Sequence, residues 1–373
     1  MKVLHVVVAG EIGGAERMLC ELASRPDESG AEHVVALVTP NAALARMLET
    51  AGLRVRDRGR AREDAVTFLW RSLGPVDVAW LASVAREERA TLLHLHTFAS
   101  QVLGTRAARR VGAPVVRTEH STRVYDDRSC WPFSRWSLRR TDVAVAVSDH
   151  VARVAKAKAP WSAAKMVVVR NGVDVKRFAP RSSTQADAFT FVVVGRLEPR
   201  KGFDLAIEAL AQLPGVRLEV VGDGAERAAL ASLARRLGVH RRVFFHGHLD
   251  DPRATVSRAH AALCSSRAEG LGLANLEAMA LGRAVVGFRV GGVPEIVEHG
   301  VTGLLAAPGD VAALAASMRA AMSDRQALAR MGAAARAFVV ERCSIEAMCR
   351  GYADVYGRVE TADFTGRREG GKT

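Results

Sequence analysis

The chain has 373 residues, of which 49% are hydrophobic and only 5% aromatic, and its formal net charge is +13. This length is typical of two domains, and the aliphatic composition favours helices and buried parallel strands over an all-β sandwich. The five cysteines are scattered and form no Cys-x-x-Cys pair, which argues against a disulfide framework or a cysteine-based zinc site and indicates a reducing compartment.

The opening segment MKVLHVVVAGEIGG leads directly into a strand pattern and lacks the features of a signal peptide. No stretch of the sequence approaches the ~18 uninterrupted apolar residues of a membrane-spanning helix. We therefore expect a cytoplasmic protein.

Short valine-rich runs recur along the chain, with alanine- and arginine-rich segments of helical spacing between them. They predict strands at 3–9, 33–39, 91–97, 114–120, 142–148, 189–195, 216–222, 242–248, 259–265 and 284–290. This alternation predicts α/β units with parallel sheets and right-handed crossovers.

The alternation is interrupted in NGVDVKRFAPRSSTQADAF, which carries an Asn-Gly turn, a proline and a polar run. We place the boundary there, with an N-terminal domain at 1–175 and a C-terminal domain at 176–349. Two doubly wound Rossmann-like domains joined by a short link are expected to face a central cleft, because ligands of such sheets bind at the carboxyl ends of the strands.

Glycine-rich turns follow several of the predicted strands. In GEIGGAERM, Gly13 and Gly14 let the backbone approach a ligand, and the helix start that follows offers amide N–H groups to an anion. A tight turn that serves only the fold is the alternative. In VVVGRLEPRKGFD, Arg196 and Lys201 follow a buried strand and can hold a diphosphate, unless this is merely a solvated basic loop.

Two further strand ends, VVGDGAE and FFHGHLDD, can supply backbone contacts to a nucleobase through Gly222 and His248. His246 and His248 alternate around a glycine, but no nearby cysteine or third histidine completes a metal site. We predict no metal there.

In RAEGLGLANLEAMALG, Glu269 and Glu277 are separated by seven residues. Gly270 and Gly272 free the backbone at the start of a predicted helix. A carboxylate accepts hydrogen bonds in two directions, which suits adjacent sugar hydroxyls; the alternative is that both glutamates decorate a surface helix.

Together, GGAE, GRLEPRKG, VGDG, the two-glutamate stretch and GRAVVGFRVGGVPEIVEHGVTGLL resemble the retaining nucleotide-sugar glycosyltransferases of family four. The resemblance covers most of the chain and is densest from about 190 to 310. It implies the GT-B fold of two Rossmann-like domains, with a last helix at about 350–365 packing back onto the first through Tyr352 and Tyr356.

The implied reaction moves a hexose-type sugar from a nucleoside diphosphate sugar to a hydroxyl of a glycan or lipid-linked acceptor, in polysaccharide or lipopolysaccharide assembly. No cofactor besides the donor substrate is implied. The sequence contains no Asp-x-Asp pair to hold a divalent metal on the diphosphate, so we predict metal-independent transfer.

The resemblance also implies roles for individual residues. Arg196 and Lys201 bind the donor diphosphate and stabilise its developing charge, while Glu277 binds the ribose. Glu269 holds the donor sugar, and its service as a nucleophile stays open. The backbone that assists it belongs to Gly270, Leu271, Gly272 and Leu273.

In the N-terminal domain, the resemblance places Gly14 near the phosphates and His120, in RTEHS, at the transferred sugar as a catalytic residue. Gly13, His96 and Glu16 fall on the acceptor side. For both histidines, a strand-end side chain with a hydrogen-bond partner is the structural alternative.

Positive charge concentrates between residues 121 and 170, where ten Lys/Arg face four Asp/Glu, a surplus of six. The tryptophans Trp70, Trp80, Trp131, Trp136 and Trp161 all precede residue 162. Aromatic and arginine residues interleaved in this way suit an anionic membrane surface on the inner face of the membrane, or alternatively a core helix with solvated arginines.

Four alternative functions are weighed against this one. A nucleotide-sugar epimerase needs no acceptor, and a glycosyltransferase acting on a small soluble acceptor needs no lipid surface. A nucleic-acid binder or scaffold would explain the charge, but no stacking or helix-turn-helix signature supports it, so no nucleic-acid partner is expected. A dinucleotide dehydrogenase requires Gly-x-Gly-x-x-Gly, from which GEIGGAE departs.

Overall fold

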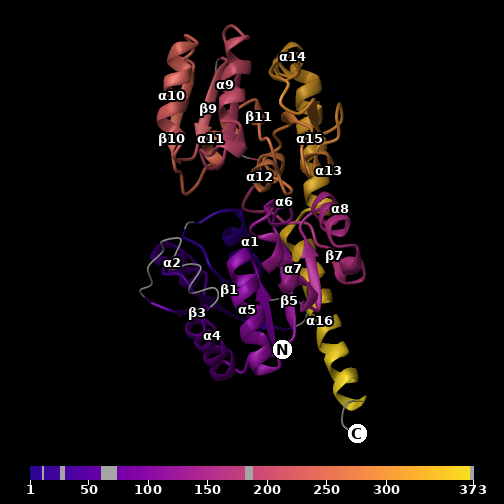
Figure 1. The fold of residues 1–373 in the computed structure, drawn as a ribbon. Coiled ribbons are helices and arrows are strands. Elements are labelled where there is room, and N and C mark those ends of the chain that lie inside the picture. The colour runs from indigo at the N-terminus through magenta and orange to yellow at the C-terminus, as the bar shows by residue number, and fades with distance from the viewer. Residues whose placement is uncertain (11, 26–29, 60–73, 181–187, 370–373) are drawn as a thin grey trace. The chain divides into compact units, whose positions relative to one another are not determined.

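The computed structural model describes residues 1–10, 12–25, 30–59, 74–180 and 188–369. It divides into two compact units (Figure 1): unit 1 comprises Met1–Asn171 and Glu346–Thr373, and unit 2 comprises Gly172–Ile345. The limits expected from the sequence, after residues 175 and 349, each fall four residues later than these divisions.

Unit 1 is built on a parallel sheet with the strand order β3-β2-β1-β4-β5-β6-β7. Its strands are β1 (Lys2–Val7), β2 (Glu32–Leu37), β3 (Arg54–Asp57), β4 (Leu92–Leu95), β5 (Val115–Glu119), β6 (Val143–Ala146) and β7 (Met166–Val168). Its helices are α1 (Gly14–Ala23), α2 (Ala42–Thr50), α4 (Val76–Glu87), α5 (Phe98–Val111), α6 (Arg123–Asp126), α7 (Trp131–Arg139), α8 (Asp149–Lys158), the 3-10 turn η1 (Pro160–Lys165) and α16 (Ile345–Glu369).

Unit 2 repeats this plan with the strand order β10-β9-β8-β11-β12-β13. Its strands are β8 (Thr190–Val194), β9 (Arg217–Val221), β10 (Val243–Gly247), β11 (Ala261–Cys264), β12 (Val285–Phe288) and β13 (Gly303–Ala306). Its helices are η2 (Pro199–Lys201), α9 (Phe203–Ala211), α10 (Arg227–Arg236), α11 (Arg253–Arg258), α12 (Leu273–Ala280), α13 (Val293–Ile296), α14 (Val311–Ser323) and α15 (Arg325–Arg342).

Each sheet has one point where the strand order reverses, between β1 and β4 in unit 1 and between β8 and β11 in unit 2. Ligands of doubly wound sheets bind at such a switch point, beyond the carboxyl ends of the strands. The apolar strands that the sequence predicts are buried on both faces, as a helix-covered parallel sheet requires: β4 is buried along its whole length, and so are β11 and β12.

The last helix, α16, packs on the sheet of unit 1 (Figure 1). The Tyr356 hydroxyl lies 2.8 Å from His94 Nδ1, and the Tyr352 hydroxyl lies 3.0 Å from Thr118 Oγ1. A Cβ on Gly351 would lie 2.8 Å from Val169 Cγ1, so glycine allows the close approach. The far end of the chain thus completes the core of the first unit.

All ten strands expected from the sequence are present, and three further strands, β3, β7 and β13, are additional. Each of the three lies at an edge of its sheet. β3 reads RVRD and lacks an apolar run, which an edge strand does not need on both faces. β7 (MVV) and β13 (GLLA) are apolar, but they span only three and four residues. Within the described residues, none of the helices combines the length and apolar character that crossing a membrane demands.

His260 couples β8 to β11 in the core of unit 2. The backbone amide of Thr190 donates to His260 Nδ1 at 3.1 Å, and the ring stacks on Phe189 with centroids 4.6 Å apart. Burial, aided by the positive charges of Arg325 and Arg283, lowers the pKa of His260. The ring is therefore neutral, with Nδ1 unprotonated so that it can accept the hydrogen bond from Thr190.

We expect unit 2 to lose stability as the pH falls below about 6.5, because the unfolded chain then takes up a proton on His260 before the folded chain does. His260→Asn places an oxygen acceptor near the position of Nδ1 without a titrating group. Calorimetry between pH 7 and pH 5 should show a weaker pH dependence in this variant, by at most about 1.4 kcal/mol per pH unit. Wild-type pH dependence in His260→Asn, or an equal change in the exposed control His240→Asn, contradicts the assignment.

Candidate active site

The strongest candidate site lies at the switch point of unit 2. The segment after β8 carries Gly195, Arg196 and the turn η2, and the segment after β11 carries Ser265, Ser266 and Glu269. Gly202, at φ +62°, holds η2 against the end of β11, because a Cβ there would lie 2.1 Å from the Ser265 carbonyl oxygen. Backbone packing therefore brings together two segments that are more than sixty residues apart.

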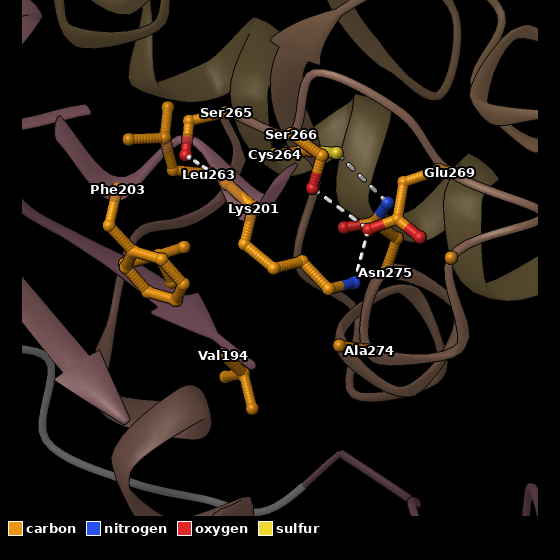
Figure 2. A pocket seen from close by; sticks show the side chains of 12 residues that line it. Val194, Lys201, Phe203, Leu263, Cys264, Ser265, Ser266, Glu269, Ala274 and Asn275 are labelled. Carbon is orange, nitrogen blue, oxygen red and sulfur yellow. Dashed lines mark hydrogen bonds and ion pairs between the residues drawn. The ribbon is translucent and has the colours of Figure 1, made fainter. Parts of the chain in front are cut away.

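An ion pair joins these segments (Figure 2). Lys201 Nζ lies 2.5 Å from Glu269 Oε1, and both side chains are mostly shielded from solvent, with 19% and 10% exposed. The same carboxylate oxygen accepts a 2.8 Å hydrogen bond from the Ser266 hydroxyl. The cation and the carboxylate therefore satisfy each other.

The sequence analysis missed several residues that support this pair. Ser265 Oγ donates to the Lys201 carbonyl at 3.1 Å, and Asn275 Nδ2 contacts Cys264 Sγ at 3.3 Å on the wall of the site. Ser265 and Ser266 directly follow a buried strand, which is the signal that could have identified them. Asn275 lies inside an apolar helix pattern, where a single amide gives no such signal.

A small cavity of about 20 Å³ opens beside the pair, enough for a single water molecule. It is lined by Val193, Val194, Lys201, Phe203, Leu263, Cys264, Ser265, Ser266, Glu269, Gly272, Ala274 and Asn275. The cavity is far smaller than a nucleotide sugar, so such a ligand would lie over its mouth rather than inside it.

The glycine-rich stretch ahead of α12 forms the rim of this site. Gly272 adopts φ +92° and precedes Leu273, the first residue of α12. Leu271 is buried, whereas Gly270 and Leu273 are half-buried. A second glycine pair supports this loop from behind: a Cβ on Gly291 would lie 1.9 Å from the Glu269 carbonyl oxygen, and the Gly292 amide donates to that oxygen at 3.2 Å.

The other residues predicted in this unit lie outside the cavity lining. Arg196 is exposed and follows Gly195, whose Cα faces the Lys201 side chain, since a Cβ there would lie 3.7 Å from Lys201 Cε. Glu277 is half-buried on α12. Gly222 packs on the Gly195 carbonyl, and His248 is exposed with its Nε2 3.5 Å from Asp250.

In unit 1, the predicted residues gather at the carboxyl ends of β1, β4 and β5. Gly13 precedes the first residue of α1, Gly14, and the Glu16 carboxylate accepts a 2.8 Å hydrogen bond from the Gly13 amide. Glu16 is buried and caps the N-terminus of α1 from within its first turn. This bond gives Glu16 a structural task at the turn.

His96 and His120 lie together, with ring centroids 5.9 Å apart and nearly parallel planes. His96 is buried and follows β4, whereas His120 is half-buried and follows β5. Burial lowers the pKa of His120 to about 4, so this ring is neutral near pH 7. A neutral imidazole can donate or accept a hydrogen bond at an uncharged sugar without adding charge.

Comparison with known proteins identifies the class. Residues 12–177 match the family model described as Glycosyltransferase Family 4, and residues 174–338 match the one described as Glycosyl transferases group 1. The glycogen synthase of Mycobacterium tuberculosis is 32% identical over 73% of this chain and 69% of its own length. The GDP-mannose-dependent α-(1-6)-phosphatidylinositol monomannoside mannosyltransferase of the same species is 31% identical over 75% of this chain and 79% of its own.

A solved structure supports the same conclusion. Anabaena HepE, in complex with UDP and glucose, matches 96% of this chain and 100% of its own with a TM-score of 0.85 at 25% identity. The two doubly wound units and these matches define a nucleotide-sugar glycosyltransferase with the GT-B fold. The chain belongs to the family 4 glycosyltransferases.

Gly291→Ala should displace Glu269, because the new Cβ would overlap the Glu269 carbonyl oxygen in addition to straining a backbone at φ +53°. A shift of about 1 Å at a reacting group costs on the order of 10²-fold in rate. Gly309→Ala is the matched control, since it has a similar φ of +73° but nothing within 4 Å of its Cβ. Equal activity of the two variants, measured as sugar-nucleotide turnover, would show that Gly291 does not position Glu269.

Proposed function

We propose that this enzyme transfers a hexose from a nucleoside diphosphate sugar to a hydroxyl of a glycan or lipid-linked acceptor, with retention of the anomeric configuration. The observation that carries the proposal is the Lys201–Glu269 pair at the switch point of unit 2. The ammonium group of Lys201 can bind a diphosphate, and the carboxylate of Glu269 can bind sugar hydroxyls. The two groups are directly hydrogen-bonded to each other.

Donor binding exchanges the partners of this pair. The diphosphate takes Lys201, with Arg196 beside it, and the carboxylate of Glu269 turns from the ammonium group to the hydroxyls of the sugar. Ser266 keeps its hydrogen bond and so holds Glu269 in place during the exchange. The backbone contacts to the donor come from Gly270, Leu271, Gly272 and Leu273. Glu277 binds the ribose, and Gly222 and His248 contact the nucleobase.

In the chemical step, the anomeric C–O bond breaks and its electron pair passes to the diphosphate. Lys201 and Arg196 stabilise the charge that develops there. The acceptor hydroxyl attacks the same face of the sugar, and its proton passes to a phosphate oxygen of the leaving group. Gly14 faces the phosphates, the neutral His120 contacts the transferred sugar, and Gly13, Glu16 and His96 border the acceptor.

We further propose that no metal ion assists at the diphosphate. Glu269 is the only carboxylate among the described residues that line the cavity, and it is already bonded to Lys201 and Ser266. A divalent metal on a diphosphate needs free oxygen ligands from the protein. Here the side chains of Lys201 and Arg196 provide the positive charge instead.

An aromatic-basic surface on unit 1 supports a membrane-bound acceptor. Trp161 and Phe133 are exposed by 40% and 37%, and the Arg139 and Lys165 side chains lie over the Trp161 ring. The Arg140 guanidinium lies 4.7 Å from the centre of Trp136. Trp70, also considered from the sequence, lies outside the described residues.

The names of two relatives support an acceptor that is a glycan or a lipid-linked glycan. One of the two relatives above is named for a polysaccharide and the other for a phosphatidylinositol mannoside. Aromatic rings and cations side by side suit the boundary between acyl chains and anionic headgroups. We propose that the enzyme works as a peripheral protein on the inner face of a membrane, in polysaccharide or lipopolysaccharide assembly.

Lys201→Ala removes the cation that compensates the leaving diphosphate, so turnover of the folded variant should fall by about 10²–10³-fold. Some loss of melting temperature is expected as well, because Glu269 loses its charged partner. The assay uses the sugar nucleotide that stabilises the wild type most in a thermal screen, with and without EDTA. Arg200→Ala is the control. Arg200 precedes Lys201 and carries the same charge, but its side chain is paired with Glu198. Near-normal turnover of Lys201→Ala would contradict the role of Lys201 at the diphosphate. If EDTA abolishes wild-type turnover and Mg²⁺ or Mn²⁺ restores it, the proposal of metal-independent transfer is wrong.

Reversing the charges of Arg139 and Arg140 to glutamate should weaken binding to anionic vesicles by more than tenfold, since each basic residue near such a surface contributes about 1 kcal/mol. Sedimentation with phosphatidylglycerol vesicles measures the effect. The same reversal at Arg235 and Arg236, two exposed arginines of unit 2, should leave binding unchanged. Wild-type protein that stays in the supernatant at low salt contradicts the membrane proposal.

A further inference from the structure

Unit 1 contains a group of buried histidines beneath its C-terminal helix. His5 on β1 and His94 on β4 are direct neighbours in the register of the two strands. His96 follows His94 by two residues, so all three rings lie on the same face of the sheet. We call these three residues the histidine cluster; their exposed fractions are 0%, 0% and 3%.

The spacing of the cluster is that of a metal site. Each ring presents a nitrogen that lies within 4.8 Å of a nitrogen from each of the other two. His5 Nδ1 and His96 Nε2 are 2.9 Å apart. Two nitrogens bound to one tetrahedral Zn²⁺ at about 2.0–2.1 Å lie roughly 3.3 Å apart, so a shift of a few tenths of an ångström at this pair admits an ion.

The surroundings of the cluster resemble the outer shell of a metal centre. His5 Nε2 lies 2.8 Å from His33 Nδ1, and His94 Nδ1 lies 2.8 Å from the Tyr356 hydroxyl. Histidines that bind metals almost always engage their second ring nitrogen in a hydrogen bond, which fixes the tautomer and the ring orientation. His94 also contacts Thr118 through Nε2 at 2.8 Å, and it would exchange one of its two hydroxyl partners for the ion.

The hydrogen bonds of the cluster depend on which ring nitrogens carry the protons. His96 Nδ1 is buried and has no hydrogen-bond partner among the described residues. A neutral His5 carries one N–H, so it donates either to His33 or to His96, and the other bond depends on the neighbouring ring.

We propose that His5, His94 and His96 form a binding site for a divalent transition-metal ion of the Zn²⁺ type. Three imidazoles and no carboxylate favour such an ion over Mg²⁺ or Ca²⁺, which prefer oxygen ligands. The site lies within unit 1, and its role is structural: the ion links β1 to β4 and, through Tyr356, to α16. His96 also borders the acceptor in the proposed function, but the zinc-binding test needs no transfer reaction.

The test uses the full-length protein, stripped with chelator, reloaded with Zn²⁺ and freed of excess metal. We expect one zinc ion per chain by elemental analysis and a higher melting temperature for the loaded protein. His5→Gln should weaken zinc binding by more than about 100-fold, since loss of an outer-shell partner alone costs 10–100-fold. His240→Gln, which removes an exposed histidine of unit 2, should bind zinc like the wild type.

X-ray absorption on the loaded wild type keeps the test decisive if His5→Gln does not fold. Imidazole nitrogens at about 2.0–2.1 Å support the site, whereas a shell of oxygen or sulfur overturns it. Protein that retains no zinc after buffer exchange overturns it as well, and so does equal zinc binding by the folded His5→Gln variant. In each of those cases the cluster is a hydrogen-bonded part of the core.

Discussion

The ion pair between Lys201 and Glu269 is the contact on which the proposed donor site of unit 2 depends. Both side chains are mostly removed from solvent, so each charge needs a partner whether or not substrate is present. Three features hold the two side chains in position: the left-handed turn at Gly202, the hydrogen bond from the Ser266 hydroxyl, and the packing of Gly291 and Gly292 against the Glu269 backbone. A substrate that offers a phosphate to one group and hydroxyls to the other replaces the contact without leaving either charge unpaired.

Much of the fold follows from local sequence because buried parallel strands are apolar on both faces. The ten central strands carry that pattern, and the interruption near residue 171 falls close to the division of the units. The strands that the valine pattern does not predict lie at sheet edges. Of these, β3 reads RVRD and alternates arginine with other residues, because an edge strand can expose charged side chains. The additional packing of α16 on unit 1 rests on contacts across more than two hundred residues, which no local pattern contains.

The site was predictable to the extent that it lies at strand ends. Lys201, Glu269 and Gly272 lie along one small cavity, as adjacent strand ends at a switch point imply. Asn275 and the supporting role of Gly291 depend on how helices and loops close over the sheet, and neither produces a periodic signal. The histidines of unit 1 show the same limit, because His5 and His94 become neighbours only through the pairing of β1 with β4.

The return of α16 to unit 1 also bears on how the chain is made. Unit 2 is one continuous segment, Gly172–Ile345, and holds all of its own core once that segment is complete. Unit 1 receives Tyr352 and Tyr356 from α16, so it stays incomplete until that helix has been synthesised. Although domains generally fold from the N-terminus during synthesis, here the half that is translated first is the half that finishes last.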